Sequence, residues 1–208
     1  MKILLASPRT GSSWYYDHIE KENLKSTNVK SFGFQEFFNP IKMPHMTIQD
    51  KIDFLTNERM KGVEYTFKHH INYLINQNEN YYEGWFRDFY KCHDVVVLMR
   101  RNKWNWLLSF AVQDILSWKY AAISDAEAIY NIQEDIKEYD YKKSVEQFFE
   151  IFNQINTCSN HYQTVFYEDL LDCEINSDLV RLSSLVEYEK IIGHELTIKI
   201  WNEYEKKI

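Results

Sequence analysis

Short apolar runs alternate along the chain with longer segments in which apolar residues recur every three or four positions. Four of the short runs are rich in β-branched or aromatic residues, as buried parallel strands are, and they span 3–6, 63–67, 95–99 and 163–167. The segments 104–115 and 145–155 have the spacing of amphipathic helices. Strands that alternate with helices predict an α/β fold in which helices flank a central parallel sheet.

The composition of the chain is that of a folded globular protein, since 45 % of its 208 residues are hydrophobic and 26 % are charged. This length predicts a single domain over 1–208. The net charge of −7 argues against a general nucleic-acid binder, so any site for an anion has to be built locally. We therefore expect no nucleic acid among the partners.

The cysteines and the N-terminal segment indicate a compartment for the protein. Its three cysteines are too far apart for a metal-binding motif, and their odd number gives no complete set of disulfides. The first apolar run is broken by Pro8 and Arg9, too early for a signal peptide, and no later run approaches the length of a membrane span. These observations predict a cytoplasmic protein without a membrane span.

The loop after the first predicted strand has the residue types that bind anions. A helix N-terminus offers backbone N–H groups and a favourable dipole, and at the carboxyl end of a parallel strand it faces the usual ligand crevice. The loop residues are Arg9, Thr10, Gly11, Ser12 and Ser13, which add a fixed charge, hydroxyl donors and a close backbone approach. The simpler alternative is a tight turn with a serine cap. The lysine and spacing of a Walker A loop are missing, which disfavours a nucleoside-triphosphate kinase.

A second set of basic and hydroxyl side chains follows the strand predicted at 95–99. Arg100 and Arg101 come directly after it, and Ser109 lies eight positions beyond Arg101, about two helical turns into the next helix. The alternative for paired arginines is a solvated sheet edge or a salt bridge to a nearby acid. Two anion sites at adjacent strand ends suit a ligand with two separated phosphates.

These motifs carry a resemblance to the sulfotransferases that use 3′-phosphoadenosine 5′-phosphosulfate (PAPS). The stretch PRTGSSW (8–14) resembles their 5′-phosphosulfate loop, Arg101 with Ser109 resembles their 3′-phosphate site, and VFYEDLL (165–171) resembles a late strand-end segment. The segments 35–40 and 100–120 are similar to the bacterial trehalose-type branch. The resemblance covers most of 1–172.

The resemblance implies a P-loop NTPase-like sulfotransferase fold and transfer of a sulfuryl group from PAPS to a hydroxyl or amine, with no metal. The acceptor would be a small molecule or a carbohydrate. Arg9, in place of a lysine found in many relatives, would take part in catalysis by stabilising the leaving 5′-phosphate. Trp14 and Tyr167 would lie at the adenine. A glycine-rich segment of cytosolic relatives has no counterpart, so the 3′-phosphate would rest on Arg101 and Ser109.

Two residues compete for the role of general base, which must take a proton from the acceptor. Glu36 matches the base of the trehalose-type branch, and His70, with Lys68, has the K-x-H spacing of cytosolic aryl and steroid sulfotransferases. We favour Glu36 because its flanking segments resemble that branch more closely. Alternation along a strand predicts that only one of His69 and His70 faces the site. The alternatives are a solvated carboxylate at Glu36 and surface or capping histidines.

Two other functions remain open on the sequence. One is a P-loop-like nucleotide or small-molecule kinase, and the other is a catalytically inactive relative that binds the nucleotide. The acidic residues Glu168 and Asp169 are expected to cap the helix that begins beside them. The sequence leaves the oligomeric state open, with a homodimer as one option.

Overall fold

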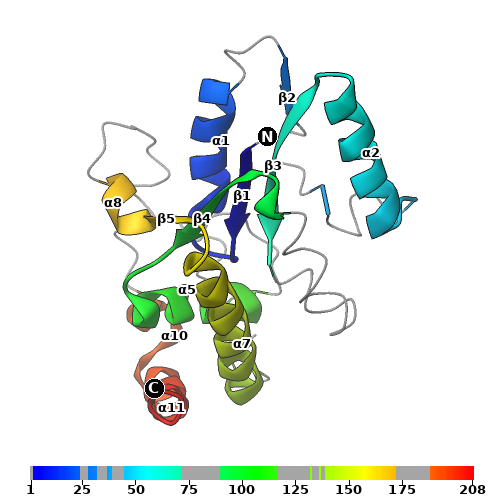
Figure 1. Cartoon of the computed structure of the whole chain (residues 1–208). Helices are drawn as coiled ribbons and strands as arrows, with labels where there is room; N and C mark the ends of the chain where they lie inside the picture. The colour runs from blue at the N-terminus through cyan, green and yellow to red at the C-terminus, as the bar shows by residue number, and fades with distance from the viewer. Residues whose placement is uncertain are drawn as a thin grey trace. The chain divides into compact units, whose positions relative to one another are not determined.

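The computed structural model describes most of the chain, and its elements are drawn in Figure 1. The described residues are 2–23, 28–31, 37–38, 45–71, 90–116, 132, 136, 139–171 and 188–208. They fall into two compact units, the first made of 1–99 with 154–167 and the second of 100–153 with 168–208. The single domain expected over 1–208 stays a prediction.

A five-stranded, all-parallel sheet forms the centre of the first unit (Figure 1). Its strands are β1 (Lys2–Ala6), β2 (Val29–Ser31), β3 (Glu64–His70), β4 (Asp94–Met99) and β5 (Gln163–Phe166). They lie in the order β2-β3-β1-β4-β5. The sheet and the helices around it confirm the predicted α/β class, and the four strands expected from the sequence are all present.

The carboxyl ends of the three central strands lie side by side. Ala6 at the end of β1 pairs with His70 of β3 on one side and with Leu98 of β4 on the other. The chain leaves β1 toward β2 and leaves β4 toward β5, so the two connections run in opposite directions. Such a switch point is where open parallel sheets bind their ligands. The loop after β1 starts at this point.

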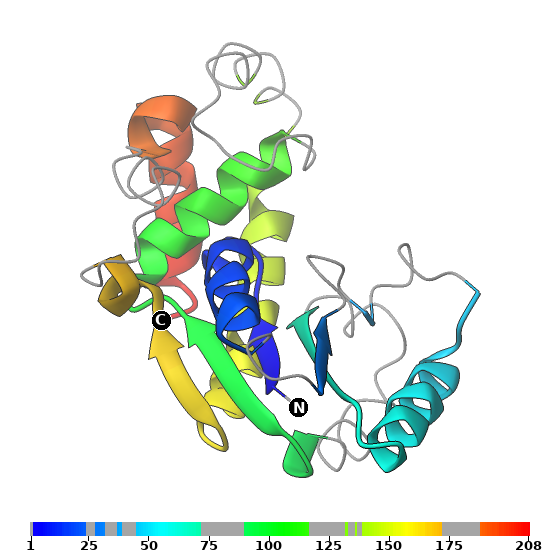
Figure 2. The same cartoon turned by 90° about the horizontal axis from the view of Figure 1, so that it is seen from above.

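The two faces of β3 are covered by different elements, because successive side chains of a strand point to opposite sides. Helix α1 (Ser12–Asn23) contacts one face through Tyr16, whose hydroxyl donates to the Thr66 carbonyl at 2.9 Å. On the other face Phe67 packs on Phe37, which also contacts Phe54 of helix α2 (Ile48–Met60). In Figure 2, α1 is the dark blue helix and α2 the cyan helix, and the two helices lie apart from each other.

Four helices make up most of the described part of the second unit. Two of them were predicted: α5 (Lys103–Ile115), and α7 (Tyr141–Ser159), whose last turns belong to the first unit. Trp106 of α5 is fully buried, and its ring meets Phe148 of α7 edge to face at 5.4 Å between centroids. Helices α10 (Tyr188–Ile192) and α11 (His194–Glu205) complete the set, and the short α8 (Tyr167–Leu171) joins the two units.

Candidate functional site

The loop between β1 and α1 turns sharply within five residues. Arg9 has a φ of 64° and Gly11 a φ of 76°, so two of three consecutive residues adopt the left-handed conformation. The Thr10 hydroxyl donates to the Ser7 carbonyl at 2.7 Å and closes the turn. The Gly11 carbonyl accepts the first backbone bond of α1, from Tyr15 at 3.1 Å. As a result α1 begins directly at the carboxyl end of β1, as the sequence predicts.

Two side chains of β3 contact the two serines that open α1. Nε2 of His70 lies 2.8 Å from the Ser12 hydroxyl, and Nζ of Lys68 donates to the Ser13 hydroxyl at 3.1 Å. Lys68 is 4 % exposed and Ser12 is 5 % exposed, whereas Ser13 is exposed and His70 half-buried, so these contacts lie at the boundary between the interior and the solvent. Lys68 and His70 are two residues apart and therefore share a face of the strand. The K-x-H spacing thus brings a cation and an imidazole to one loop.

His69 points to the other face of β3. Its Nδ1 is hydrogen-bonded to the Tyr90 hydroxyl, and its ring lies 5.1 Å from that of Phe38. It is fully buried. The prediction that only one of the two adjacent histidines faces the loop is therefore confirmed, and the one that does is His70.

Tyr167 packs directly on the loop. A Cβ atom placed on Gly11 would lie 2.6 Å from two carbons of the Tyr167 ring, so the absence of a side chain at residue 11 is what admits this ring. Tyr167 is 4 % exposed and comes immediately after β5. The end of β5, like the end of β3, thus contributes a side chain to the surroundings of the loop.

A buried tyrosine holds α1 against the sheet. The Tyr16 hydroxyl bonds to the Thr66 carbonyl at 2.9 Å and to the Ser31 hydroxyl at 3.0 Å, and Ser31 in turn donates to Glu20. Burial is the main reason why the pKa of Tyr16 rises to about 12. This contact sets the position of the helix whose first residues are Ser12 and Ser13.

The chemistry available at this loop is that of an anion site. The first N–H groups of α1 have no acceptor within the helix, and the helix dipole favours negative charge at the same end. The Lys68 ammonium and two serine hydroxyls add charged and neutral donors beside them. His70 adds an imidazole nitrogen that can accept or donate a proton. The predicted residues Arg9, Thr10, Gly11, Ser12 and Ser13 all belong to this stretch.

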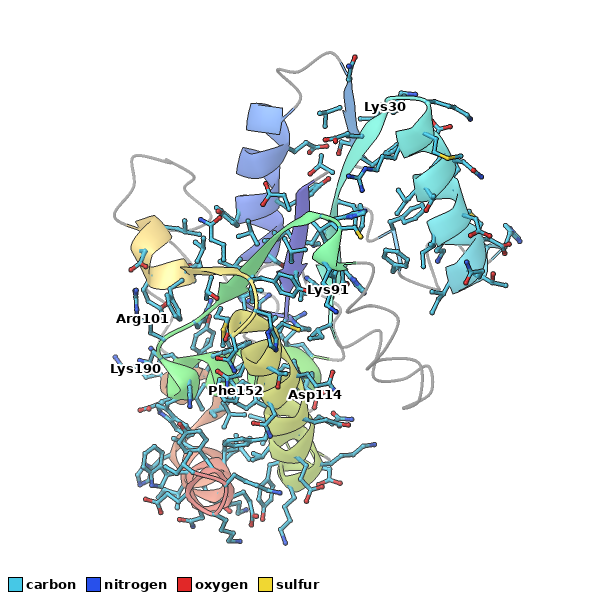
Figure 3. All side chains as sticks on the ribbon, in the orientation of Figure 1. Lys30, Lys91, Arg101, Asp114, Phe152 and Lys190 are labelled. Atoms are coloured by element: carbon cyan, nitrogen blue, oxygen red, sulfur yellow. The ribbon has the colours of Figure 1, made fainter. Side chains whose placement is uncertain are left out.

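The predicted residues for the 3′-phosphate lie in the second unit. Arg101 comes after β4, and its guanidinium forms an ion pair with Asp169 of α8 through two hydrogen bonds. Figure 3 labels Arg101 beside α8. The pair lowers the pKa of Asp169 and raises that of Arg101. Ser109 is fully buried in α5, so a ligand would reach its hydroxyl only after its neighbours move. The salt bridge considered as the alternative for these arginines is therefore present at Arg101.

Glu168 and Asp169 have partners other than the ones expected for them. Both belong to the first turn of α8, but Glu168 accepts from the backbone N–H groups of Arg101 at 3.0 Å and Asn102 at 3.2 Å. Asp169 is paired with Arg101. These bonds of the two carboxylates join α8 to the segment before α5, a contact between residues more than sixty positions apart.

Two predicted site residues have no described side chain. Glu36 lies outside the described residues, and Trp14 lies in α1. The contact of Lys68 with Ser13 was not predicted, although the alternation of β3 places residues 68 and 70 on one face. Within the described ranges no group of three His, Cys, Asp or Glu side chains is arranged to hold a metal ion. No helix in that part of the chain is long and apolar enough to cross a membrane.

Comparison with known proteins leaves the family open. No family model, no curated protein and no solved structure matches the chain. The function of the chain must therefore be inferred from the residues of the loop, their contacts and the resemblance of the motifs.

Proposed function

We propose that the chain is a sulfotransferase that moves a sulfuryl group from PAPS to a hydroxyl or amine of a small-molecule or carbohydrate acceptor. One observation carries the proposal. At the start of α1, His70 is hydrogen-bonded to Ser12 and Lys68 donates to Ser13. A sulfuryl donor needs fixed cationic and N–H donors for its leaving phosphate, and its acceptor needs a base. The loop and one strand supply both.

The loop would stabilise the 5′-phosphate as it leaves. Charge builds on the phosphate oxygen when its bond to sulfur breaks, and donors that are already in place lower the energy of that state. Ser12, Ser13 and the N–H groups of α1 are such donors, and Arg9 and Lys68 supply positive charge. In this proposal Arg9 stands in place of the missing Walker lysine, and Lys68 adds a second positive charge from β3.

The proton and the sulfuryl group move in opposite directions. The acceptor oxygen or nitrogen forms a bond to sulfur, and the bond between sulfur and the 5′-phosphate oxygen breaks with its electron pair left on the phosphate. The Ser12 hydroxyl turns its single proton from Nε2 of His70 to the 5′-phosphate, and the freed Nε2 takes the proton of the acceptor. We assign the base to His70 because its imidazole nitrogen is already at the loop, 2.8 Å from Ser12. Glu36 stays the competing candidate from the resemblance.

The rest of the donor would be held by the other residues that the motifs indicate. Arg101 and Ser109 would bind the 3′-phosphate, and Tyr167 and Trp14 would lie toward the adenine. The central parallel sheet with an anion loop after β1 supports a P-loop-like sulfotransferase fold. We keep the cytoplasm as the expected location.

A transfer assay tests the function. The protein is incubated with PAPS radiolabelled in its sulfuryl group and with sets of hydroxyl and amine acceptors, carbohydrates included. We expect label in at least one acceptor, and its loss with His70→Ala, while Lys199→Ala, an exposed change in α11, leaves the rate unchanged. Nucleotide binding without transfer to any acceptor would instead indicate an inactive relative, and magnesium-dependent transfer from ATP would indicate a kinase.

A further inference from the structure

The segment that precedes α5 has its N–H donors directed at two acidic side chains. Nη1 and Nη2 of Arg101 donate to the two carboxylate oxygens of Asp169, the second at 2.7 Å. The backbone N–H groups of Arg101 and Asn102 donate to the two oxygens of Glu168, at 3.0 and 3.2 Å. All of these groups belong to the second unit. Four donors are thus taken by two neighbouring carboxylates.

The same four donors are of the kind that binds a phosphate. A guanidinium binds two oxygens of a phosphate or a carboxylate with the same fork of N–H groups, and backbone N–H groups before a helix bind either anion. Under the proposed function Arg101 holds the 3′-phosphate of the donor. A phosphate on Arg101 and the carboxylate of Asp169 would therefore compete for one set of N–H groups.

The ion pair is accessible to solvent and is therefore displaceable. The side chains of Arg101 and Asp169 are 52 % and 54 % exposed, and exposed pairs of this type contribute little net free energy. A phosphate monoester carries a charge of roughly −1.5 to −2 at neutral pH, whereas the carboxylate carries a single negative charge. When a phosphate replaces the Asp169 carboxylate on Arg101, the electrostatic attraction to the guanidinium increases. When another singly charged group replaces it, the attraction stays almost the same.

We propose that Asp169, with Glu168 beside it, is a built-in competitor of the 3′-phosphate that occupies the donors of Arg101 until a doubly charged phosphate displaces it. The inference rests on the proposed function, because it takes Arg101 as the ligand of the 3′-phosphate. Ligands with a hydroxyl, a sulfate or a carboxylate at the corresponding position do not displace Asp169. Displacement of Asp169 therefore lowers the affinity for 3′-phosphorylated nucleotides and leaves the affinity for nucleotides without a 3′-phosphate unchanged.

The test uses two nucleotides that differ only in the 3′-phosphate. 3′-Phosphoadenosine 5′-phosphate (PAP) and AMP are titrated in a calorimeter into the full chain and into Asp169→Asn, which keeps the shape of the side chain and removes its charge. We expect PAP to bind about two- to fivefold more tightly to Asp169→Asn, in proportion to the strength of an exposed ion pair, and AMP to bind equally to both proteins. Glu195→Gln, which removes an exposed ion pair of α11, is the matched control and should change neither affinity.

The outcomes separate the inference from the proposed function. If PAP binds the unchanged chain but Asp169→Asn leaves its affinity equal or lowers it, the carboxylate does not compete with the phosphate and the inference is wrong, while the function stands. A second variant, Asp169→Ser, must change the PAP affinity in the same direction. If the unchanged chain binds neither nucleotide, the proposed function fails first, and the inference fails with it.

Discussion

Nε2 of His70 lies 2.8 Å from the hydroxyl of Ser12, and this hydrogen bond joins residues 58 positions apart. It forms because β1 and β3 are neighbouring parallel strands, so that the loop after one lies beside the last residues of the other. Lys68 makes a second contact of this kind, with Ser13. The candidate site is therefore assembled by the strand order rather than by any single motif.

Replacement of the proposed base should reduce turnover and leave nucleotide affinity intact. We expect His70→Ala to lower kcat roughly a hundredfold or more, because the acceptor would keep its proton, and to leave the Kd of PAP within a factor of about three. Steady-state transfer kinetics and calorimetry of the same samples measure the two quantities.

Glu36→Gln is the comparison for this variant. It should leave kcat nearly unchanged if His70 is the base. The opposite pattern, in which Glu36→Gln abolishes turnover and His70→Ala does not, would return the assignment to Glu36.

The contact between Gly11 and Tyr167 predicts an unusually costly glycine substitution. Gly11→Ala meets the Tyr167 ring at 2.6 Å in addition to the strain of its positive φ. Gly62 provides the control, since its φ of 79° is similar and no atom lies within 4 Å of an added Cβ. We expect Gly11→Ala to lose about 1–3 kcal/mol more free energy of unfolding than Gly62→Ala, the usual cost of overpacking. If urea denaturation gives the same loss of unfolding free energy for both variants, the Tyr167 ring moves aside without destabilising the protein, and the prediction is wrong.

The Tyr16 hydroxyl should make stability depend on pH at high pH. Its pKa is raised in the folded protein to about 12 from an ordinary value of 10.0, so the unfolded chain loses this proton first. The stabilisation is complete below about pH 10 and is lost as the pH rises toward about 12. Tyr16→Phe should therefore flatten the fall in the free energy of unfolding over this window, by about 2 kcal/mol. An identical fall in both proteins would contradict the assignment.

Lys68 and Arg101 should differ in which nucleotides they affect. Lys68→Met, which keeps the bulk of a buried side chain, should weaken PAP and AMP alike, because both carry a 5′-phosphate. Arg101→Ala should weaken PAP alone. Each loss is expected at about 1.5–3 kcal/mol, the value of a hydrogen bond to a charged group. Calorimetry with both ligands checks the pattern, and a loss of AMP binding in Arg101→Ala would contradict the assigned roles.

The features that local patterns specify were predicted from the sequence. The apolar runs at 3–6 and 95–99 became β1 and β4, and the small residues after the first run became the turn into α1. Strand alternation also separated His69 from His70 correctly. The strand β2 was not predicted, because its three residues, VKS, are too few and too polar to form an apolar run.

The partners of charged side chains could not be predicted in the same way. Lys68 contacts Ser13 because β3 and β1 are neighbours in the sheet. Glu168 accepts from the N–H groups of Arg101 and Asn102 because it follows β5 and they follow β4, and these two strands are neighbours as well. From the local sequence, Glu168 and Asp169 were predicted to cap the helix in which they lie, because acidic side chains are favourable at a helix N-terminus. Strand order decides such contacts, and no local pattern records it.

Titration of PAP into the full chain in a calorimeter, with Ser12→Ala as the second sample, tests the central claim most directly. We predict saturable binding of one nucleotide per chain without added magnesium. We also predict a loss of about 1.5–3 kcal/mol of binding free energy in Ser12→Ala, because a hydroxyl donor to the 5′-phosphate is removed. The absence of any binding at millimolar PAP would contradict the proposed function.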